Sequence, residues 1–324
     1  MTSPDANATV ESLVRTRQML LVTGKGGTGK TLVSAALARL GAQLGRRVFC
    51  AEISSDPEAS SRVAEAFGVK LTGEVPRELA PNLKVGLVTP TMGHRRFLED
   101  VLPVRLLADA AMRSGALKRF LAAAPAFSEM GVLYGLMELA NRRRADGARE
   151  NELLVVDLPA TGHALALAQV PDALFKLVPN GPVGEAVKEG LALLRDPSRT
   201  ASLVVTLLEP LPVSESLELV QGVLKHGIPV NGVIANRVVR QGLSNEQLSA
   251  GREALAGMPP LLGARLFGQL ERSRQMLDRL GREFTQPLAL LDELPDRGRA
   301  LVDAAADALG RAPLQPPARV GVGT

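Results

Sequence analysis

Short apolar runs alternate along the chain with segments in which apolar residues recur every three to four positions. The runs predict buried strands, and the periodic segments predict amphipathic helices. The expected strands are residues 18–23, 47–53, 83–88, 152–158, 202–208, 230–236 and 261–267. The expected helices are residues 30–44, 57–67, 163–169, 185–195, 214–226, 245–256 and 297–309. This alternation predicts an α/β fold with a doubly wound, mainly parallel sheet.

One stretch departs from the alternation. Residues 93–145 contain amphipathic helical segments without a convincing strand, which predicts a helical insertion at an edge or end of the sheet. The remainder of residues 18–311 is expected to form one α/β domain. Residues 1–17 are expected to be a flexible N-terminus, and residues 312–324, rich in Pro and Gly, a disordered tail.

The composition narrows the choice of partners. Of the 324 residues 46% are hydrophobic but only 3% are aromatic, which argues against base-stacking platforms for single-stranded nucleic acid. The net charge of +4 is too small to imply nucleic-acid binding by itself. The basic cluster at residues 142–144 is interpreted as a solvated helix end.

Cysteine usage and hydropathy indicate a cytoplasmic protein. Cys50 is the sole cysteine, so a disulfide within the chain and a CxxC zinc pair are both excluded. It lies in an apolar run and is expected to be a core thiol. Residues 1–17 lack the apolar region of a signal peptide, and no apolar stretch reaches the length that spans a bilayer.

A glycine-rich motif follows the first expected strand and opens the first long helix. It reads Gly24-Lys25-Gly26-Gly27-Thr28-Gly29-Lys30-Thr31. In this context the motif predicts a P-loop, whose backbone N–H groups and helix N-terminus surround the phosphates of ATP. Lys30 is expected to bridge the outer phosphates, and the Thr31 hydroxyl is expected to ligate Mg²⁺. Residues 18–311 are thus expected to be a P-loop ATPase domain.

Lys25 adds a second lysine to this loop. The motif resembles the deviant Walker A loops of a class of P-loop ATPases. The resemblance implies that Lys25 reaches across a dimer to the phosphates of the other subunit, as an arginine finger does. A solvent-facing lysine is the alternative.

Two further segments, residues 54–60 and 157–163, point to a particular family. They read Ser-Ser-Asp-Pro-Glu-Ala-Ser and Asp-Leu-Pro-Ala-Thr-Gly-His. They resemble the two switch segments of the ArsA/Get-type ATPases, which include the arsenite-pump ATPases and the targeting factors for tail-anchored membrane proteins. The resemblance extends from about Met19 to Leu309.

The family's roles transfer to matching positions. The resemblance implies that Asp56 of switch I positions or activates the attacking water, and that Asp157, the Walker B carboxylate, holds Mg²⁺ through water. Asp56 could instead be only a helix cap before Pro57. Asn236 resembles the family's adenine-reading asparagine, and Pro287, with the leucine after it, the loop that closes over the base.

Several positions depart from the family pattern. Switch II reads Leu158-Pro159-Ala160 where the family has Thr-Ala-Pro, and Glu58 stands where a small residue is usual. The zinc-binding cysteines of the eukaryotic targeting factors and the arsenite-binding cysteines of the pumps are both missing. The chain carries one P-loop rather than a tandem pair, so the expected dimer is a homodimer.

Half of the eight methionines lie in the helical insertion or directly before it, namely Met92, Met112, Met130 and Met137. Flexible methionines suit a groove for apolar helices, but they also pack helical cores. We therefore expect a dimeric ATP-hydrolysing switch that handles a hydrophobic helical client. The alternatives are a partition-type regulatory ATPase acting on a protein partner, and an inactive partner of a related ATPase.

Overall fold

A single sheet organises the chain. The computed structural model describes residues 9–101, 125–159, 181–239, 244–255 and 262–316. Its eight strands run in the order β3-β4-β2-β5-β1-β6-β7-β8, and all neighbouring pairs are parallel except β3 and β4. Their bounds are Met19–Gly24 (β1), Val48–Ile53 (β2), Arg77–Ala80 (β3), Leu83–Val88 (β4), Leu153–Asp157 (β5), Thr200–Leu207 (β6), Val230–Val238 (β7) and Leu288–Asp292 (β8). The predicted doubly wound, mainly parallel fold is confirmed.

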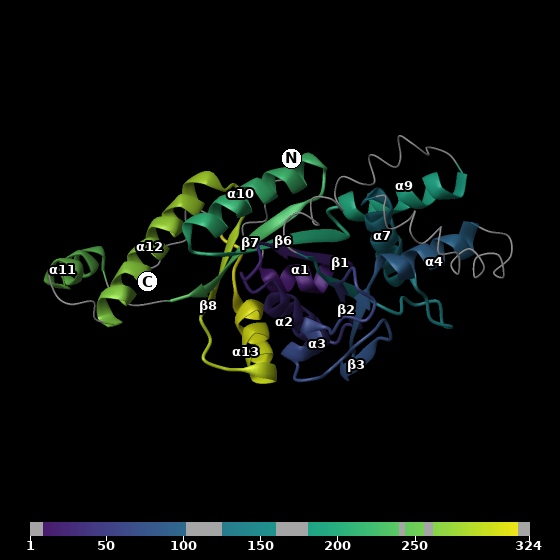
Figure 1. Ribbon diagram of the computed structural model, residues 1–324, viewed down its shortest axis with the longest axis horizontal. Helices are drawn as coiled ribbons and strands as arrows, with labels where there is room; N and C mark the ends of the chain where they lie inside the picture. Colours follow the sequence, from purple (N-terminus) through teal and green to yellow (C-terminus); the bar gives the residue numbers. More distant parts are fainter. Residues whose placement is uncertain (1–8, 102–124, 160–180, 240–243, 256–261, 317–324) are drawn as a thin grey trace.

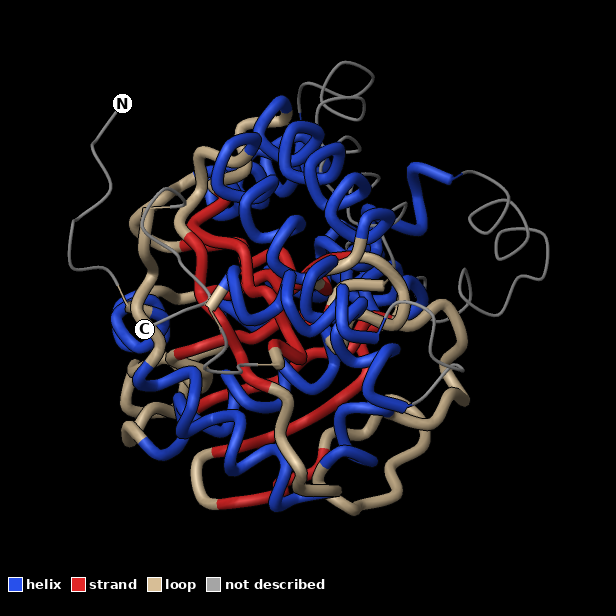
Figure 2. Tube along the Cα trace, turned by 90° about the vertical axis from the view of Figure 1, so that its left-hand side faces the viewer, coloured by secondary structure: helices blue, strands red, loops and turns tan. Residues whose placement is uncertain are grey.

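Helices cover both faces of the sheet (Figures 1 and 2). One face carries α1 (Val10–Thr16), α2 (Lys30–Gln43), α3 (Arg62–Ala66) and α13 (Gly298–Arg311). The other carries α7 (Pro125–Asn141), α9 (Gly181–Arg195), α10 (Pro210–Lys225) and α12 (Leu262–Glu283). Helix α4 (Pro90–Val101) packs on α7, and α11 (Asn245–Leu255) packs on α12.

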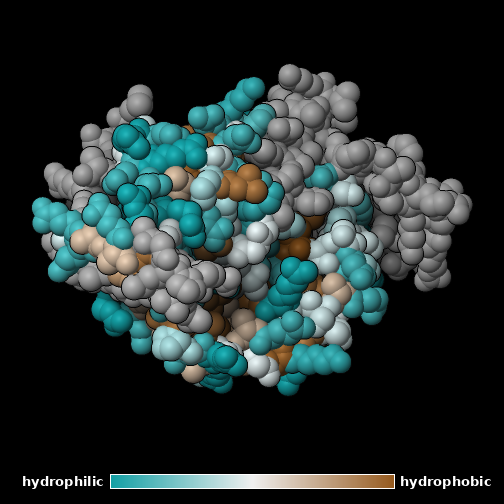
Figure 3. Space-filling model, turned by 60° about the vertical axis from the view of Figure 1, so that its left-hand side comes forward, coloured by the Kyte–Doolittle hydropathy of each residue, from teal (hydrophilic) through white to brown (hydrophobic). Residues whose placement is uncertain are grey.

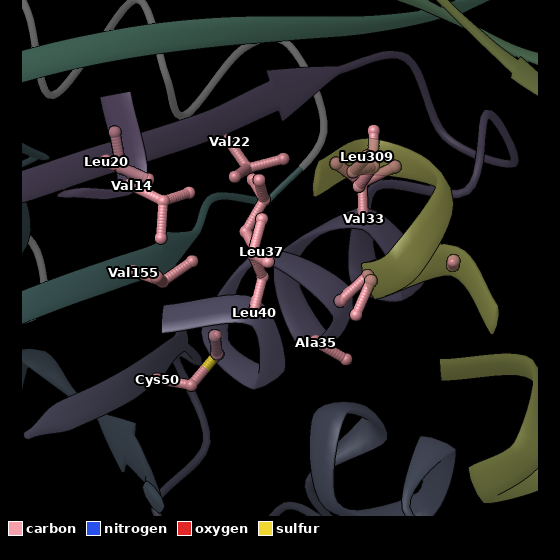
Figure 4. Close-up of a cluster of buried hydrophobic side chains, with 14 of the residues drawn as sticks. Val14, Leu20, Val22, Val33, Ala35, Leu37, Leu40, Cys50, Val155 and Leu309 are labelled. Carbon is pink, nitrogen blue, oxygen red and sulfur yellow. The ribbon is translucent and has the colours of Figure 1, made fainter. Parts of the chain in front are cut away.

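Alternation along β1 divides its side chains between two cores. Leu20 and Val22 join the core beneath α2, whereas Met19 and Leu21 join the core beneath α10. Both cores exclude water, as expected for a parallel strand with helices on each side. Figure 4 shows the first core, where Leu37 of α2 lies among strand side chains such as Val155. Cys50 belongs to this core, which confirms the predicted core thiol.

The described parts of the two terminal segments, residues 9–17 and 312–316, are more ordered than expected. Residues 10–16 form helix α1 instead of a flexible segment, because Thr9 and Ser12 form a capping box and Val10 and Val14 are buried. Beyond α13, residues 312–316 also depart from the expected disorder. Leu314 is buried there, and residue 315 forms a bridge with Leu288. The rest of the tail lies outside the described residues.

Three local predictions differ from the structure. Residues 262–267, expected as a strand, begin α12, whose buried Leu270, Leu277 and Leu280 continue at helical spacing. The helix expected at 57–67 is confined to α3, which starts after its cap Ser61. Strands β3 and β8 were not predicted, because β3 is short and largely exposed and β8 was interpreted as a base-binding loop. The helix expected at 163–169 lies outside the described residues.

The helical stretch near residues 93–145 begins with α4 and ends with α7. These helices approach closely, since a Cβ on Gly93 would lie 1.7 Å from the Gly131 carbonyl oxygen. Met130 and Met137 are buried, with 4% and 6% of their surface exposed, so these two methionines pack the core. Among the described residues, no helix combines the length and the apolar character needed to cross a bilayer. Hydrophilic residues predominate on the face drawn in Figure 3, with apolar residues in small patches between them.

Candidate nucleotide-binding site

The glycine motif forms a tight loop between β1 and α2. Gly24, at φ 146°, cannot be replaced without strain, because a Cβ there would lie 2.2 Å from the Val205 carbonyl oxygen on β6. Gly29, the residue before α2, has φ 93°. Cβ atoms built on Gly26 and Gly27 would meet no atom within 4 Å, so this part of the loop backbone is open to a ligand. The loop thus leaves room for phosphate groups at the N-terminus of a long helix.

The lysine of the helix closes over the loop. The Lys30 ammonium donates to the Lys25 carbonyl oxygen at 2.9 Å, and the Thr28 hydroxyl donates to the same oxygen at 2.9 Å. Burial lowers the pKa of Lys30, with Asp157 opposing and Arg62 adding to the effect. The predicted phosphate lysine therefore lies inside the loop, as a phosphate contact requires.

Asp157 ends β5 beside the first turn of α2. Its carboxylate accepts hydrogen bonds from Thr31 Oγ1 at 2.9 Å and from Ser34 Oγ at 3.0 Å. Burial raises the pKa of Asp157 to about 6, against the opposing effect of these two hydroxyls and of Lys30. Ser34 was not predicted as a site residue. Its spacing of three residues from Thr31, one turn of helix, is the signal that could have identified it.

These oxygen atoms fit a magnesium site. Thr31 and Asp157 place a hydroxyl and a carboxylate together at the N-terminus of α2, and Mg²⁺ prefers oxygen ligands completed by water and substrate phosphates. The carboxylate is ionised at neutral pH even with its raised pKa. Thr31 and Asp157 could therefore hold Mg²⁺, as the sequence predicted. Among the described residues, no group of three or more His, Cys, Asp and Glu side chains suits a metal ion.

Asn236 lies against the phosphate loop. Its Nδ2 donates to the Thr28 carbonyl oxygen at 2.8 Å, and its Oδ1 accepts from the Arg237 N–H at 2.9 Å. A Cβ on Gly29 would lie 2.2 Å from this amide, so the contact also requires a glycine at that position. The predicted site residue thus joins the site, where it supports the loop. Its contact with adenine stays a prediction.

Pro287 lies at the wrong end of its strand for the predicted role. It precedes β8, and its carbonyl oxygen accepts from the Val233 N–H near the start of β7. The parallel strands place the phosphate loop at their carboxyl ends, and β8 reaches that edge only at Asp292. A base-binding segment on this strand would have to follow Asp292 rather than precede Leu288.

The second lysine of the loop points to another helix. The Lys25 ammonium forms an ion pair with the Glu215 carboxylate on α10. Glu215 was not predicted, because no local pattern connects a helix residue to a loop 190 positions earlier. The other carboxylate oxygen of Glu215 is buried without a partner among the described residues. This pair holds Lys25 away from the interior of its own loop, and 42% of the lysine side chain is exposed.

Switch I lies at the same edge of the sheet but does not contact the loop through Asp56. The Asp56 carboxylate is exposed and accepts from the Glu58 N–H at 2.9 Å, which caps a turn rather than a helix. Glu52, on β2, anchors the other end of this segment by accepting from the Ser61 hydroxyl and the Val63 N–H. It also contributes to the raised pKa of Asp157, although less than burial does. Switch II is described only to Pro159.

A glycine loop closed by a lysine, a helix N-terminus and a buried carboxylate beside a threonine define a P-loop nucleotide hydrolase on a doubly wound sheet. The family model of the anion-transporting ATPases matches residues 17–180. The ATPase BagA of Mycobacterium tuberculosis is 30% identical over 238 residues, which cover 72% of this chain and 68% of the relative.

Two further relatives match a similar share of the chain. The ATPase GET3 of Zygosaccharomyces rouxii is 23% identical over 261 residues, which cover 69% of this chain and 73% of the relative. An arsenical pump-driving ATPase of Escherichia coli is 29% identical over 239 residues, 72% of this chain but only 37% of the relative. The chain therefore belongs to the anion-transporting ATPase family, of the ArsA and GET3 type, and is an ATPase.

Proposed function

We propose that the chain works as a homodimeric switch, closed by ATP with Mg²⁺ and opened by hydrolysis. The observation that carries the proposal is the position of Lys25. Its side chain is paired with Glu215 on a neighbouring helix and leaves the phosphate positions of its own loop to Lys30. A half-exposed lysine beside the loop is free to act on the phosphates of a second copy once that ion pair opens.

The roles of the site residues follow from their chemistry. Backbone N–H groups of the loop and Lys30 hold the phosphates, and Lys25 of the second copy stabilises the charge that develops during transfer. Asp56 orients the attacking water once switch I has moved toward the loop. Thr31 and Asp157 would hold Mg²⁺, which when bound would neutralise phosphate charge and orient the outer phosphates.

Glu52 links the metal site at Asp157 to switch I. It lies opposite Asp157 in the register of β2 and β5, and it holds the start of α3 just beyond switch I. A change in charge around Asp157 therefore changes the electrostatic environment of the Glu52 carboxylate, which anchors switch I. This offers a direct route from the occupancy of the metal site to the position of Asp56.

We further propose that the switch acts on a hydrophobic helical client. The support is the resemblance to ATPases that target membrane proteins and the helical stretch that begins with α4 and ends with α7. Buried Met130 and Met137 weaken the part of the hypothesis that assigned them to a groove. The partition-type alternative is not favoured, because the family relationship is to ArsA and GET3-type ATPases.

A trapping experiment tests both parts. The Asp56→Asn chain is purified with ATP and Mg²⁺, its mass is measured in solution, and its bound proteins are identified by mass spectrometry. The same chain with ADP is the matched control. We expect an ATP-dependent dimer that retains proteins with one apolar helix. A monomer under ATP would overturn the dimer, whereas a dimer without such proteins would overturn only the client.

A further inference from the structure

An arginine cluster lies at the edge of the sheet opposite the phosphate loop. It comprises Arg143, Arg149 and Arg199. Arg143 and Arg149 face each other as partners of an antiparallel bridge in the turn after α7. Arg199 directly precedes β6, and its carbonyl oxygen accepts the N–H groups of Gln18 and Met19 at the start of β1. The Gln18 carbonyl in turn accepts the N–H of Leu154 at the start of β5.

The charges of Arg143 and Arg199 act on the guanidinium group of Arg149. The pKa of Arg149 is lowered first by burial and then by the positive charges of Arg199 and Arg143. Like charges placed opposite each other on paired segments destabilise a fold. Arg143 and Arg149 thus place like charges opposite each other, and an anion bound between them and Arg199 would offset that repulsion.

Carboxylates on this face are engaged by other cations. They form the pairs Glu138–Arg142, Asp146–Arg144, Glu150–Lys84 and Glu152–Arg47. Asp196 accepts hydrogen bonds from the Ser198 N–H and hydroxyl, and the charge of Arg199 adds to the lowering of the Asp196 pKa without a direct ion pair between these two described residues. Within the described part of the chain, no member of the arginine cluster forms an ion pair with a carboxylate.

Two orphaned donors flank the cluster. Arg47 donates to the Arg149 carbonyl oxygen at 2.9 Å, yet its Nε is buried without an acceptor among the described residues. The Nε of Arg17, next to Gln18, is also buried without an acceptor among the described residues. Buried guanidinium N–H groups without acceptors are costly, so an anion that reached these two donors would be stabilised.

We propose that the arginine cluster is a second anion site that binds a phosphate monoester. Guanidinium groups donate in planar forks that match phosphate oxygens, and three of them suit one dianionic group. The site is separate from the nucleotide site, because the phosphate loop follows the carboxyl end of β1 whereas Arg199 and Arg149 precede β6 and β5. The three arginines gather around two strand starts instead of forming a stripe, which favours one compact phosphate group over a nucleic-acid backbone.

The test is a titration of the full-length chain with glycerol 3-phosphate by calorimetry. ADP and Mg²⁺ are saturating, so that the phosphate loop is occupied. We expect saturable binding that weakens about tenfold or more in Arg149→Gln and in Arg143→Gln, since each loses charge-assisted hydrogen bonds. The matched control is Arg144→Gln, which removes an arginine of the same turn that already pairs with Asp146.

Two results would overturn the site: equal binding by wild type and both cluster variants, and heat that sodium chloride of the same ionic strength reproduces. Co-sedimentation with phosphatidylcholine vesicles, with and without phosphatidic acid, distinguishes the source of the phosphate group. Binding to phosphatidic acid vesicles that is lost in Arg149→Gln would assign the site to a lipid headgroup. Binding of the free ester alone would assign it to a soluble metabolite.

Discussion

The ammonium group of Lys25 contacts the carboxylate of Glu215 within one chain. If Lys25 acts on the phosphates of a second copy, this contact must break before the dimer can hydrolyse ATP. Glu215 therefore competes with the partner's nucleotide for the same lysine. The competition sets how readily the closed dimer forms.

Replacing Glu215 by Gln should release Lys25. We expect the Glu215→Gln chain to dimerise with ATP at a protein concentration up to about fivefold lower, the size of effect that a partly exposed ion pair allows. ATP turnover at low protein concentration should rise accordingly. Mass measurement in solution reports dimerisation, and phosphate release reports ATP turnover. Both are measured across a protein dilution series.

The control is Glu218→Gln, which removes an exposed carboxylate from the same helix. It should leave dimerisation and turnover as in wild type. Loss of activity in Glu215→Gln with normal dimerisation would contradict the competition and give Glu215 a positive role in holding Lys25.

Asp56→Asn should hydrolyse ATP about a hundredfold or more slowly, the usual effect of losing a general base, while nucleotide affinity stays normal. The exposed Asp56 carboxylate makes only a local turn contact, so the substitution leaves the core intact. Single-turnover hydrolysis and ADP binding measure the two quantities. Glu58→Gln, two residues along, is the matched control, and normal turnover in Asp56→Asn would remove Asp56 from the mechanism.

Asn236→Ala should loosen the phosphate loop. The substitution leaves the Thr28 carbonyl without the donor that now lies at 2.8 Å, which costs about 1–3 kcal/mol for a buried group. We expect nucleotide affinity to fall about tenfold, since part of this cost appears when the loop must be ordered around phosphate. Calorimetric titration with ADP measures it.

Asn231→Ala provides the comparison on the same strand. Its amide oxygen accepts from the Ser202 N–H at 3.3 Å, away from the loop. It should lower the melting temperature without changing ADP affinity. Equal loss of affinity in both variants would mean that Asn236 acts through general stability alone.

The parts of the site that the sequence predicted are contiguous motifs. Residues 24–31 lie between an apolar run and a periodic segment, so strand, loop and helix could be assigned together, and Asp157 closes its own apolar run. Pro287 failed because a Pro-Leu pair has no periodicity of its own. The run that follows it forms β8 and places that proline at the opposite edge.

Glu215 and Glu52 could not be predicted for a different reason. Their roles depend on which strands become neighbours, and strand order is a tertiary property. Glu52 lies opposite Asp157 because β2 pairs with β5, and Glu215 meets Lys25 because β6 pairs with β1. Residues 262–267 show that local pattern alone can mislead, because a short apolar run fits a strand and the start of an amphipathic helix equally well.

Asp157→Asn should make the nucleotide-free fold more stable at neutral pH. The folded carboxyl group, with a pKa of about 6 against 3.8 for the free group, binds its proton more tightly than the unfolded chain does. Raising the pH through this window therefore removes stability, by about 3 kcal/mol in total, and the loss is complete above the folded pKa. The Asn variant has no proton to lose and should escape this loss.

Urea unfolding in EDTA, from about pH 4 to about pH 7, measures the difference between the two chains. The stability of Asp157→Asn relative to wild type should grow with pH, and its binding of ATP with Mg²⁺ should weaken, because the metal loses its carboxylate. Asp146→Asn, which removes an exposed carboxylate, controls for any Asp-to-Asn change. If the unfolding free energies of Asp157→Asn and wild type change with pH in parallel, other groups in the folded chain offset the cost of burying the charged Asp157 carboxylate. The weakened metal-dependent binding would then rest on ligand loss alone.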